Sequence, residues 1–90
     1  MANIKSARKR ARQNEKRRMR NRYYKTTARG YVKKARELID AGQLDEAEVA
    51  VVDATRALDT AAGKGIIHKN NASRRKSRLT LHLNKAKAQA

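Results

Sequence analysis

LDEAEVAVVDATRALDTAA, residues 44–62, holds the strongest periodic signal in the chain. Its apolar residues recur at intervals of three and four, which places them on one face of an α-helix. That face consists of Leu44, Ala47, Val51, Ala54, Leu58 and Ala61. Asp45 and Glu46 fall in the first turn, where negative charge complements the helix dipole. The stretch predicts an amphipathic helix with a small, alanine-rich face toward its neighbours.

A longer helix is predicted upstream, over residues 6–41. Ser6 is a good N-cap residue type, and Gly42 suits the left-handed position just past a helix end. The expected core stripe is Tyr24, Ala28, Tyr31, Ala35 and Leu38, widened by Val32 and Ile39. Gly30 costs about 1 kcal/mol relative to alanine and allows a bend. Upstream of Tyr24 the stripe stops, because polar residues take the positions that would continue it.

A third helix is predicted over residues 67–87, after a turn marked by Gly63 and Gly65. Its apolar stripe is Ala72, Leu79, Leu83 and Ala86. Lys76 occupies the position between Ala72 and Leu79, so the start of this helix is not expected to lie in a closed, dry core.

Short glycine-containing connections make successive helices antiparallel neighbours. The expected fold is therefore all-α, a single domain over residues 1–90 built as an antiparallel three-helix bundle. At 1.5 Å per residue, the first helix spans roughly 54 Å and the second roughly 28 Å. The first helix should overhang its partners by about 25 Å. That overhang is the arginine-rich segment that lacks an apolar stripe.

The charge of the chain is large and segregated. The 90 residues carry a net charge of +16; residues 1–36 hold 15 basic and one acidic residue, whereas residues 37–63 hold one basic and seven acidic residues. Such a field is typical of proteins that bind polyanions. The chain has no cysteine, which excludes disulfides and thiolate metal sites. It also lacks the apolar runs of a secretory signal or a membrane span, so we expect a soluble, cytoplasmic protein.

Residues 7–22, ARKRARQNEKRRMRNR, are the first candidate site. Basic residues occur at nearly every helical phase, so this segment has no apolar face for another protein and is expected to be surrounded by phosphates. The alternative is a solvated helix or a basic tail. The candidate binding residues here are Arg8, Lys9, Arg10, Arg12, Lys16, Arg17, Arg18, Arg22 and, one turn on, Lys25.

Residues 64–79, KGIIHKNNASRRKSRL, are the second candidate site. A helix N-terminus favours phosphate through its dipole and free N–H groups, and Asn and Ser side chains can contact sugar hydroxyls. The alternative is a capped helix start with a solvated basic face. The candidates are His68, Lys69, Asn70, Arg74, Arg75, Lys76, Ser77 and Arg78.

Other polar and aromatic residues are weaker candidates. Tyr24 and Tyr31 are expected in the core. Tyr23 lies off the stripe, and a role in base stacking fits it about as well as a place in the core. His68 and His82 lie fourteen residues apart with no cysteine or nearby carboxylate, so no metal site is expected. No nucleophile triad, phosphate loop or carboxylate pair is present, and we expect no enzyme, no cofactor and no small-molecule substrate.

Two other classes of basic helix fit poorly. A leucine-zipper DNA binder would follow its basic region with several leucine-rich heptads, and a membrane-surface helix would carry large apolar residues opposite its charges. A histone-like compactor, which binds nucleic acid through charge and shape alone, remains open. Asp45, Glu46, Asp53 and Asp59 are expected to face outward, either simply solvated or turned away from the polyanion.

The start MANIKSARKR, the pair Asn21-Arg22 and above all residues 64–79 resemble the bacterial ribosomal proteins numbered twenty in the small-subunit series. The resemblance covers essentially the whole chain. It implies a structural component of the small ribosomal subunit that binds small-subunit ribosomal RNA directly, early in assembly, with few or no protein contacts and no membrane contact. It also adds Lys5 and Ser6 to the candidate RNA-binding residues.

Overall fold

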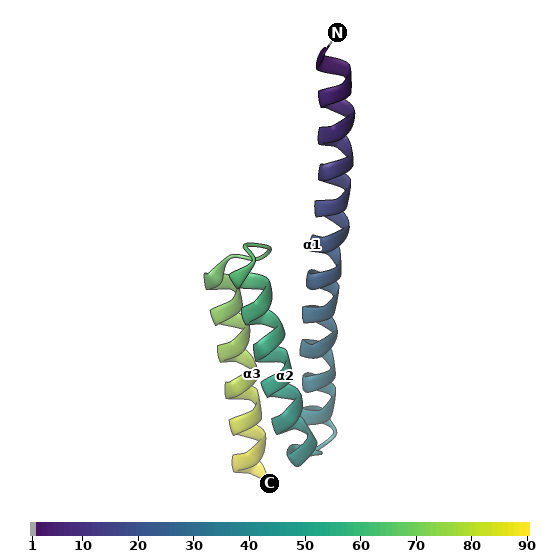
Figure 1. The fold of residues 1–90 in the computed structure, drawn as a ribbon. Helices are drawn as coiled ribbons and strands as arrows, with labels where there is room; N and C mark the ends of the chain where they lie inside the picture. The colour runs from purple at the N-terminus through teal and green to yellow at the C-terminus, as the bar shows by residue number, and fades with distance from the viewer. Residues whose placement is uncertain (1) are drawn as a thin grey trace.

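The chain forms three helices, α1 (Ala2–Asp40), α2 (Leu44–Gly63) and α3 (Lys69–Gln89), in a computed structural model that describes residues 2–90. Successive helices run antiparallel and α2 packs against both others, so α1 and α3 point in the same direction (Figure 1). The described residues contain no strand. The all-α three-helix bundle expected from the periodicity is confirmed. None of the three helices combines the length and apolar character that crossing a bilayer requires.

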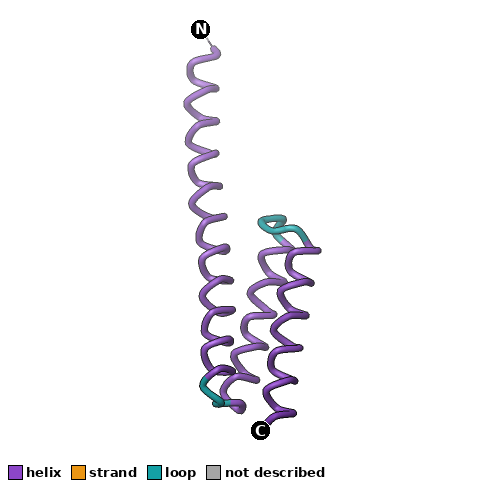
Figure 2. The backbone as a smooth tube through the Cα atoms, turned by 180° about the vertical axis from the view of Figure 1, so that it is seen from behind, coloured by secondary structure: helices purple, strands orange, loops and turns teal. Residues whose placement is uncertain are grey.

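Glycine ends the first two helices in the expected way. Gly42 has φ +77° and lets the Gln43 N–H donate to the Leu38 carbonyl at 3.0 Å, which satisfies a group that the helix end leaves free. Gly65, with φ +75°, plays the same part after α2, where the Ile66 N–H donates to the Ala61 carbonyl at 2.9 Å. These turns form two short loops at opposite ends of the bundle (Figure 2).

The start of α1 differs from the prediction. The helix begins at Ala2 rather than near Ser6, so Ser6 lies inside the helix and does not cap it. The residues just upstream of Ser6 do not oppose this extension, because alanine and lysine are good helix formers and isoleucine is tolerated. Downstream, α1 continues through Gly30, whose conformational cost does not break the helix.

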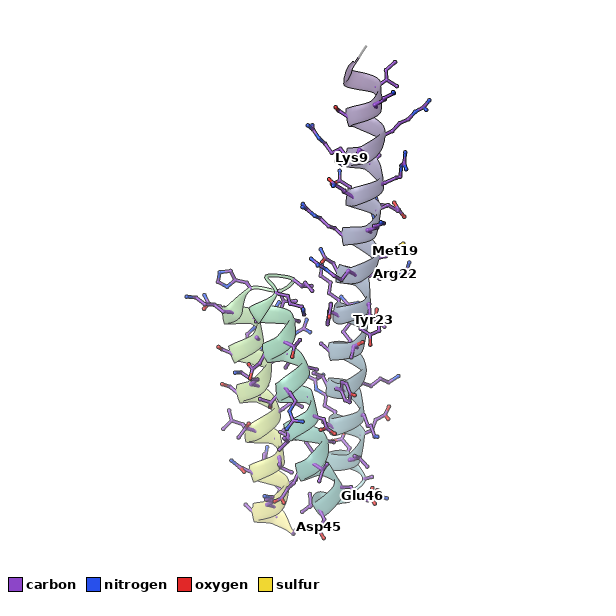
Figure 3. All side chains as sticks on the ribbon, in the orientation of Figure 1. Lys9, Met19, Arg22, Tyr23, Asp45 and Glu46 are labelled. Carbon is purple, nitrogen blue, oxygen red and sulfur yellow. The ribbon has the colours of Figure 1, made fainter. Side chains whose placement is uncertain are left out.

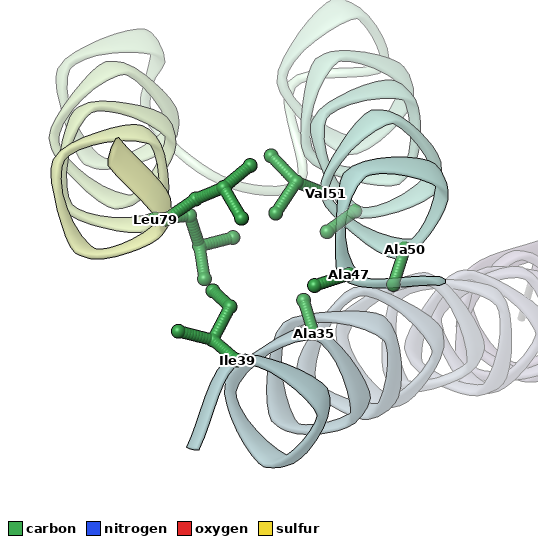
Figure 4. Packing of buried hydrophobic residues seen from close by; sticks show 8 residues of the cluster. Ala35, Ile39, Ala47, Ala50, Val51 and Leu79 are labelled. Atoms are coloured by element: carbon green, nitrogen blue, oxygen red, sulfur yellow. The ribbon is translucent and has the colours of Figure 1, made fainter. Parts of the chain in front are cut away.

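The core is narrow and rich in alanine (Figure 4). In α2 the predicted stripe is buried, with Leu44 half-buried and Ala50 joining the buried set. In α3 the predicted residues Ala72, Leu79 and Leu83 are buried, whereas Ala86 of the predicted stripe is only half-buried. Ala47, Ala54 and Ala61 are fully buried and seven residues apart on α2. Side chains this small let the neighbouring helices approach closely.

The contribution of α1 to the core is shifted from the predicted stripe. Ala28, Ala35 and Ile39 are buried, but Tyr31 is 41% exposed and Tyr24 only half-buried. The prediction that both tyrosines lie in the core is therefore wrong for Tyr31 and only partly right for Tyr24. An alanine-lined contact leaves no space for a phenol ring, so the large rings lie at its margins.

Residues 4–22 of α1, here called the arm, extend beyond the rest of the bundle (Figures 1 and 3). Every residue from Ile4 to Arg20 is exposed, and the first buried residue after Ile4 is Ala28. The molecule is 68 Å long but only 21 Å and 14 Å across. The overhang expected from the helix lengths is confirmed.

Candidate nucleic-acid interface

The arm carries positive charge around its whole circumference. Figure 3 shows side chains leaving this part of α1 on all sides, with Lys9 and Arg22 labelled. No residue of the arm forms an ion pair within residues 2–90, and its only acid is Glu15. The sequence-predicted residues Lys5, Ser6, Arg8, Lys9, Arg10, Arg12, Lys16, Arg17, Arg18 and Arg22 all lie here and are exposed. The arm is therefore an uncompensated rod of cations.

Two aromatic rings lie where α1 first contacts the rest of the bundle. The Tyr23 and Tyr24 rings meet edge to face, with centroids 5.3 Å apart. The Lys64 ammonium, from the loop between α2 and α3, lies 5.1 Å from the centre of the Tyr24 ring. This cation–π contact ties the loop to α1. Tyr23 stays 64% exposed, so its ring is available for stacking.

A groove of about 510 Å³ separates α1 from α3 below the arm. From α1 it is lined by Arg29, Val32, Lys33 and Arg36, and from α3 by Arg74, Arg75 and Arg78. Val32 is half-buried and is the only apolar lining residue. No acidic side chain lines this space, here called the α1/α3 groove.

The first turn of α3 lies beside the upper end of this groove. The His68 Nδ1 accepts a hydrogen bond from the Asn70 N–H at 3.1 Å, so His68 caps the helix. The acceptor role of Nδ1 leaves Nε2 as the donor of the neutral ring. Lys25 and Arg29 of α1 join His68 and Arg75 around a second depression of about 300 Å³. Lys69 and Asn70 are exposed in the same turn.

The structure divides the candidate residues of α3 between two faces. Arg74, Arg75 and Arg78 line the α1/α3 groove. Lys76 and Ser77 instead line a separate depression with residues of α3 alone. The Lys76 Nζ lies 2.7 Å from the Asp59 Oδ1 of α2, so this cation already has a partner.

The acidic residues at the start of α2 lie far from the arm. Asp45 and Glu46 are exposed at the opposite end of the bundle (Figure 3), and Asp59 is exposed. Asp53 is half-buried rather than fully outward, so the prediction for it holds only in part. Glu48 pairs with Lys87 of α3, and the Asp40 Oδ1 lies 3.0 Å from the His82 Nε2. These contacts hold helices together at the end far from the arm.

Arg29, Lys33 and Arg36 are candidate residues that the sequence analysis missed. Their spacing of four and three residues places them on one face of α1, a signal that was readable in the sequence. The spacing does not say which neighbour that face meets. Only the packing of α3 beside α1 brings them together with Arg74, Arg75 and Arg78.

The arrangement is suited to binding polyanions. Arginine guanidinium groups present forked donors that match phosphate oxygens, and lysine adds mobile point charges. Within residues 2–90 no group of three or more His, Asp or Glu side chains could hold a metal ion.

Comparison with known proteins gives the family. A family model described as ribosomal protein S20 matches residues 2–84. A small ribosomal subunit protein bS20 from Thermomicrobium roseum is 52% identical over 84 residues, covering 93% of this chain and 85% of the relative. Relatives of the same name from Mycobacterium sp. (strain JLS) and Clostridium acetobutylicum are 52% and 47% identical, covering 94% and 98% of this chain and 99% and 100% of their own lengths. These matches confirm the resemblance found in the sequence and, with it, a non-enzymatic class and a place in the small subunit of the bacterial ribosome. The chain belongs to the ribosomal protein S20 family.

Proposed function

We propose that the chain binds small-subunit ribosomal RNA directly and stabilises the packing of that RNA during assembly. The observation that carries the proposal is the arm, a helical segment whose exposed cations form no ion pair within residues 2–90. Phosphates are the natural partners of such a rod, and release of their counterions supplies most of the affinity. Because the arm is charged on all sides, it can neutralise more than one RNA segment at once and let those segments approach.

RNA is the expected main partner, with few or no protein contacts. Contacts other than those to phosphates lie at the margins of the interface, where exposed Tyr23 can stack on a base and the exposed side chains of Asn70 and Ser77 can reach sugar hydroxyls. The acidic end of α2 repels the polyanion, which favours one docking orientation. A histone-like compactor needs neither this orientation nor a preferred RNA.

The deciding experiment is competitive binding. Labelled small-subunit ribosomal RNA is bound at physiological salt in the presence of equal masses of unrelated RNA or duplex DNA. We expect the ribosomal RNA to resist both competitors. Equal competition by all three nucleic acids would support the compactor and reject the proposal.

Two variants that remove the same number of charges distinguish the effect of charge position on binding from the effect of net charge. The arm variant Arg10→Gln/Arg12→Gln/Arg17→Gln and the control Lys34→Gln/Arg56→Gln/Lys85→Gln each remove three positive charges. We expect the arm variant to lose about tenfold or more in affinity, since each phosphate contact is a charge-assisted hydrogen bond. The control should lose much less. Equal losses would mean that net charge, rather than the arm, determines binding.

A further inference from the structure

The α1/α3 groove lies between α1 and α3, the two helices of the bundle that pack on each other least. Their one polar link within residues 2–90 is the pair between Asp40 and His82, which lies beyond the C-terminal end of the groove. Along the groove itself, six cations from two helices face the same space.

These cations repel one another across the groove. No acid lines the space, and none of the six side chains forms an ion pair in the part of the chain that the structure describes. Like charges brought together in this way oppose the approach of α3 to α1. The fold therefore brings together a charge cluster that no protein group offsets.

The spacing of the cations fits an extended anion. Arg29 and Arg36 are seven residues apart, or about 10.5 Å along the helix, and Arg74 and Arg78 span about 6 Å on the parallel neighbour. Successive phosphates of one nucleic-acid strand advance by about 3.4 Å along the axis of a duplex. Over the span of about 6 Å that both helices line, two or three consecutive phosphates can lie between two rows of donors, five of the six being arginine.

We propose that the α1/α3 groove binds a run of two or three backbone phosphates and that their binding fastens α3 to α1. The groove is then a second site, distinct from the arm, whose ligand completes the bundle by bridging two helices that repel each other without it. The natural source of the phosphates rests on the proposed function, namely ribosomal RNA. The site itself requires only a short chain of phosphates.

The test measures thermal unfolding of the full chain by circular dichroism, with inorganic tripolyphosphate added at constant ionic strength. A ligand that binds only the folded state raises the melting temperature. We expect a saturable rise for the unchanged chain and for a double arm variant, Arg8→Gln/Arg12→Gln, which removes as many charges as the groove variant. For the groove variant Arg36→Gln/Arg78→Gln, the required concentration should increase about tenfold or more, since two charge-assisted contacts are lost. Orthophosphate should be much weaker than tripolyphosphate.

Melting without added anion and a comparison with a poly-glutamate peptide extend the test. Without added anion at low salt, the groove variant should melt at a higher temperature than the unchanged chain, because repulsion is relieved. A second pair, Arg29→Gln/Arg75→Gln, should behave in the same way. Equal loss of the tripolyphosphate effect in the double arm variant Arg8→Gln/Arg12→Gln would overturn the proposal. Stronger stabilisation by a poly-glutamate peptide than by tripolyphosphate would also overturn it, because the groove would then suit an acidic protein segment.

The outcome is independent of ribosomal RNA binding. If tripolyphosphate has no groove-dependent effect while ribosomal RNA still outcompetes duplex DNA, only the groove assignment fails. If the RNA preference is absent while the groove variants respond as expected, the proposed function fails and the phosphate site stands.

Discussion

The Lys76 Nζ of α3 lies 2.7 Å from the Asp59 Oδ1 of α2. Lys76 occupies a heptad position that usually holds a core residue. Leucine there would close the top of the bundle, but the chain instead places an ammonium group at its edge. The Lys76 and Asp59 side chains remain 33% and 55% exposed, so solvent screens the pair. Such a pair contributes little to folding. Its more notable effect is that a candidate RNA-binding cation is held by an acid of the same chain.

Removing that acid should affect binding more than folding. For Asp59→Asn we expect a change of less than about 1 kcal/mol in the free energy of unfolding. Affinity for ribosomal RNA should rise by up to about fivefold, because Lys76 is released and one repulsive charge is lost. Chemical denaturation and a binding titration measure the two quantities. Asp45→Asn is the matched control at the far end of α2, and an equal gain from it would show that net charge alone is responsible.

Leu58 and Val52 allow the buried face of α2 to be tested with one substitution. Leu58 is 0% exposed, whereas Val52 of the same helix is 54% exposed. Leu58→Asp places an unpaired charge in the core and should cost several kcal/mol, comparable with the whole stability of a small domain. Val52→Asp should change stability by about 1 kcal/mol or less. The measurement is helicity at 25 °C; full helicity in Leu58→Asp would show that the buried face is misassigned.

The periodicity of the sequence specified the bundle well because it reports burial directly. In α2 and α3 the three–four spacing of Val51, Leu58, Leu79 and Leu83 identified the buried faces, and all four are buried. In α1 the same spacing predicted Tyr31 in the core, but the ring is 41% exposed. Periodicity gives the direction of a face but not the distance to the helix opposite. That distance depends on the alanines of α2.

The candidate site was only partly readable for a related reason. The arm could be predicted, because the missing apolar stripe can be recognised from the sequence of one helix alone. The α1/α3 groove requires knowing that α3 lies beside the face of α1 that carries Arg29, Lys33 and Arg36. Lys76 and Ser77 were grouped with Arg74 and Arg78 by sequence, yet they lie on another face of α3. Proximity along the chain does not identify the residues that share a groove.

Salt dependence should count the phosphates that the protein neutralises. For contact with about eight to ten phosphates we expect log K to fall with log salt at a slope of roughly −6 to −9. In the arm variant Arg10→Gln/Arg12→Gln/Arg17→Gln the slope should weaken by about 2 to 3, since each lost contact removes 0.7 to 0.9. The control Lys34→Gln/Arg56→Gln/Lys85→Gln should keep the slope of the unchanged chain. A slope near −2 in the unchanged chain would show that the arm is not the main contact.

Hydrogen exchange should reveal that the arm depends on RNA for its order. Residues 4–20 are exposed throughout, so their helical hydrogen bonds have no tertiary packing behind them. Like charges along the helix weaken it further, and an unsupported helix of this length is only marginally stable. In the free protein we expect amides 7–22 to exchange within about a factor of ten of an unstructured chain.

The core provides the internal reference for the same experiment. Amides of residues 50–58 in α2 lie among buried side chains and should be protected to the level set by global unfolding. On binding ribosomal RNA, protection should rise strongly in residues 7–22 and change little in residues 50–58, because phosphates replace the missing packing only along the arm. Strong protection of the arm without RNA would contradict this. It would mean that the rod is rigid in advance and that RNA packs around a preformed helix.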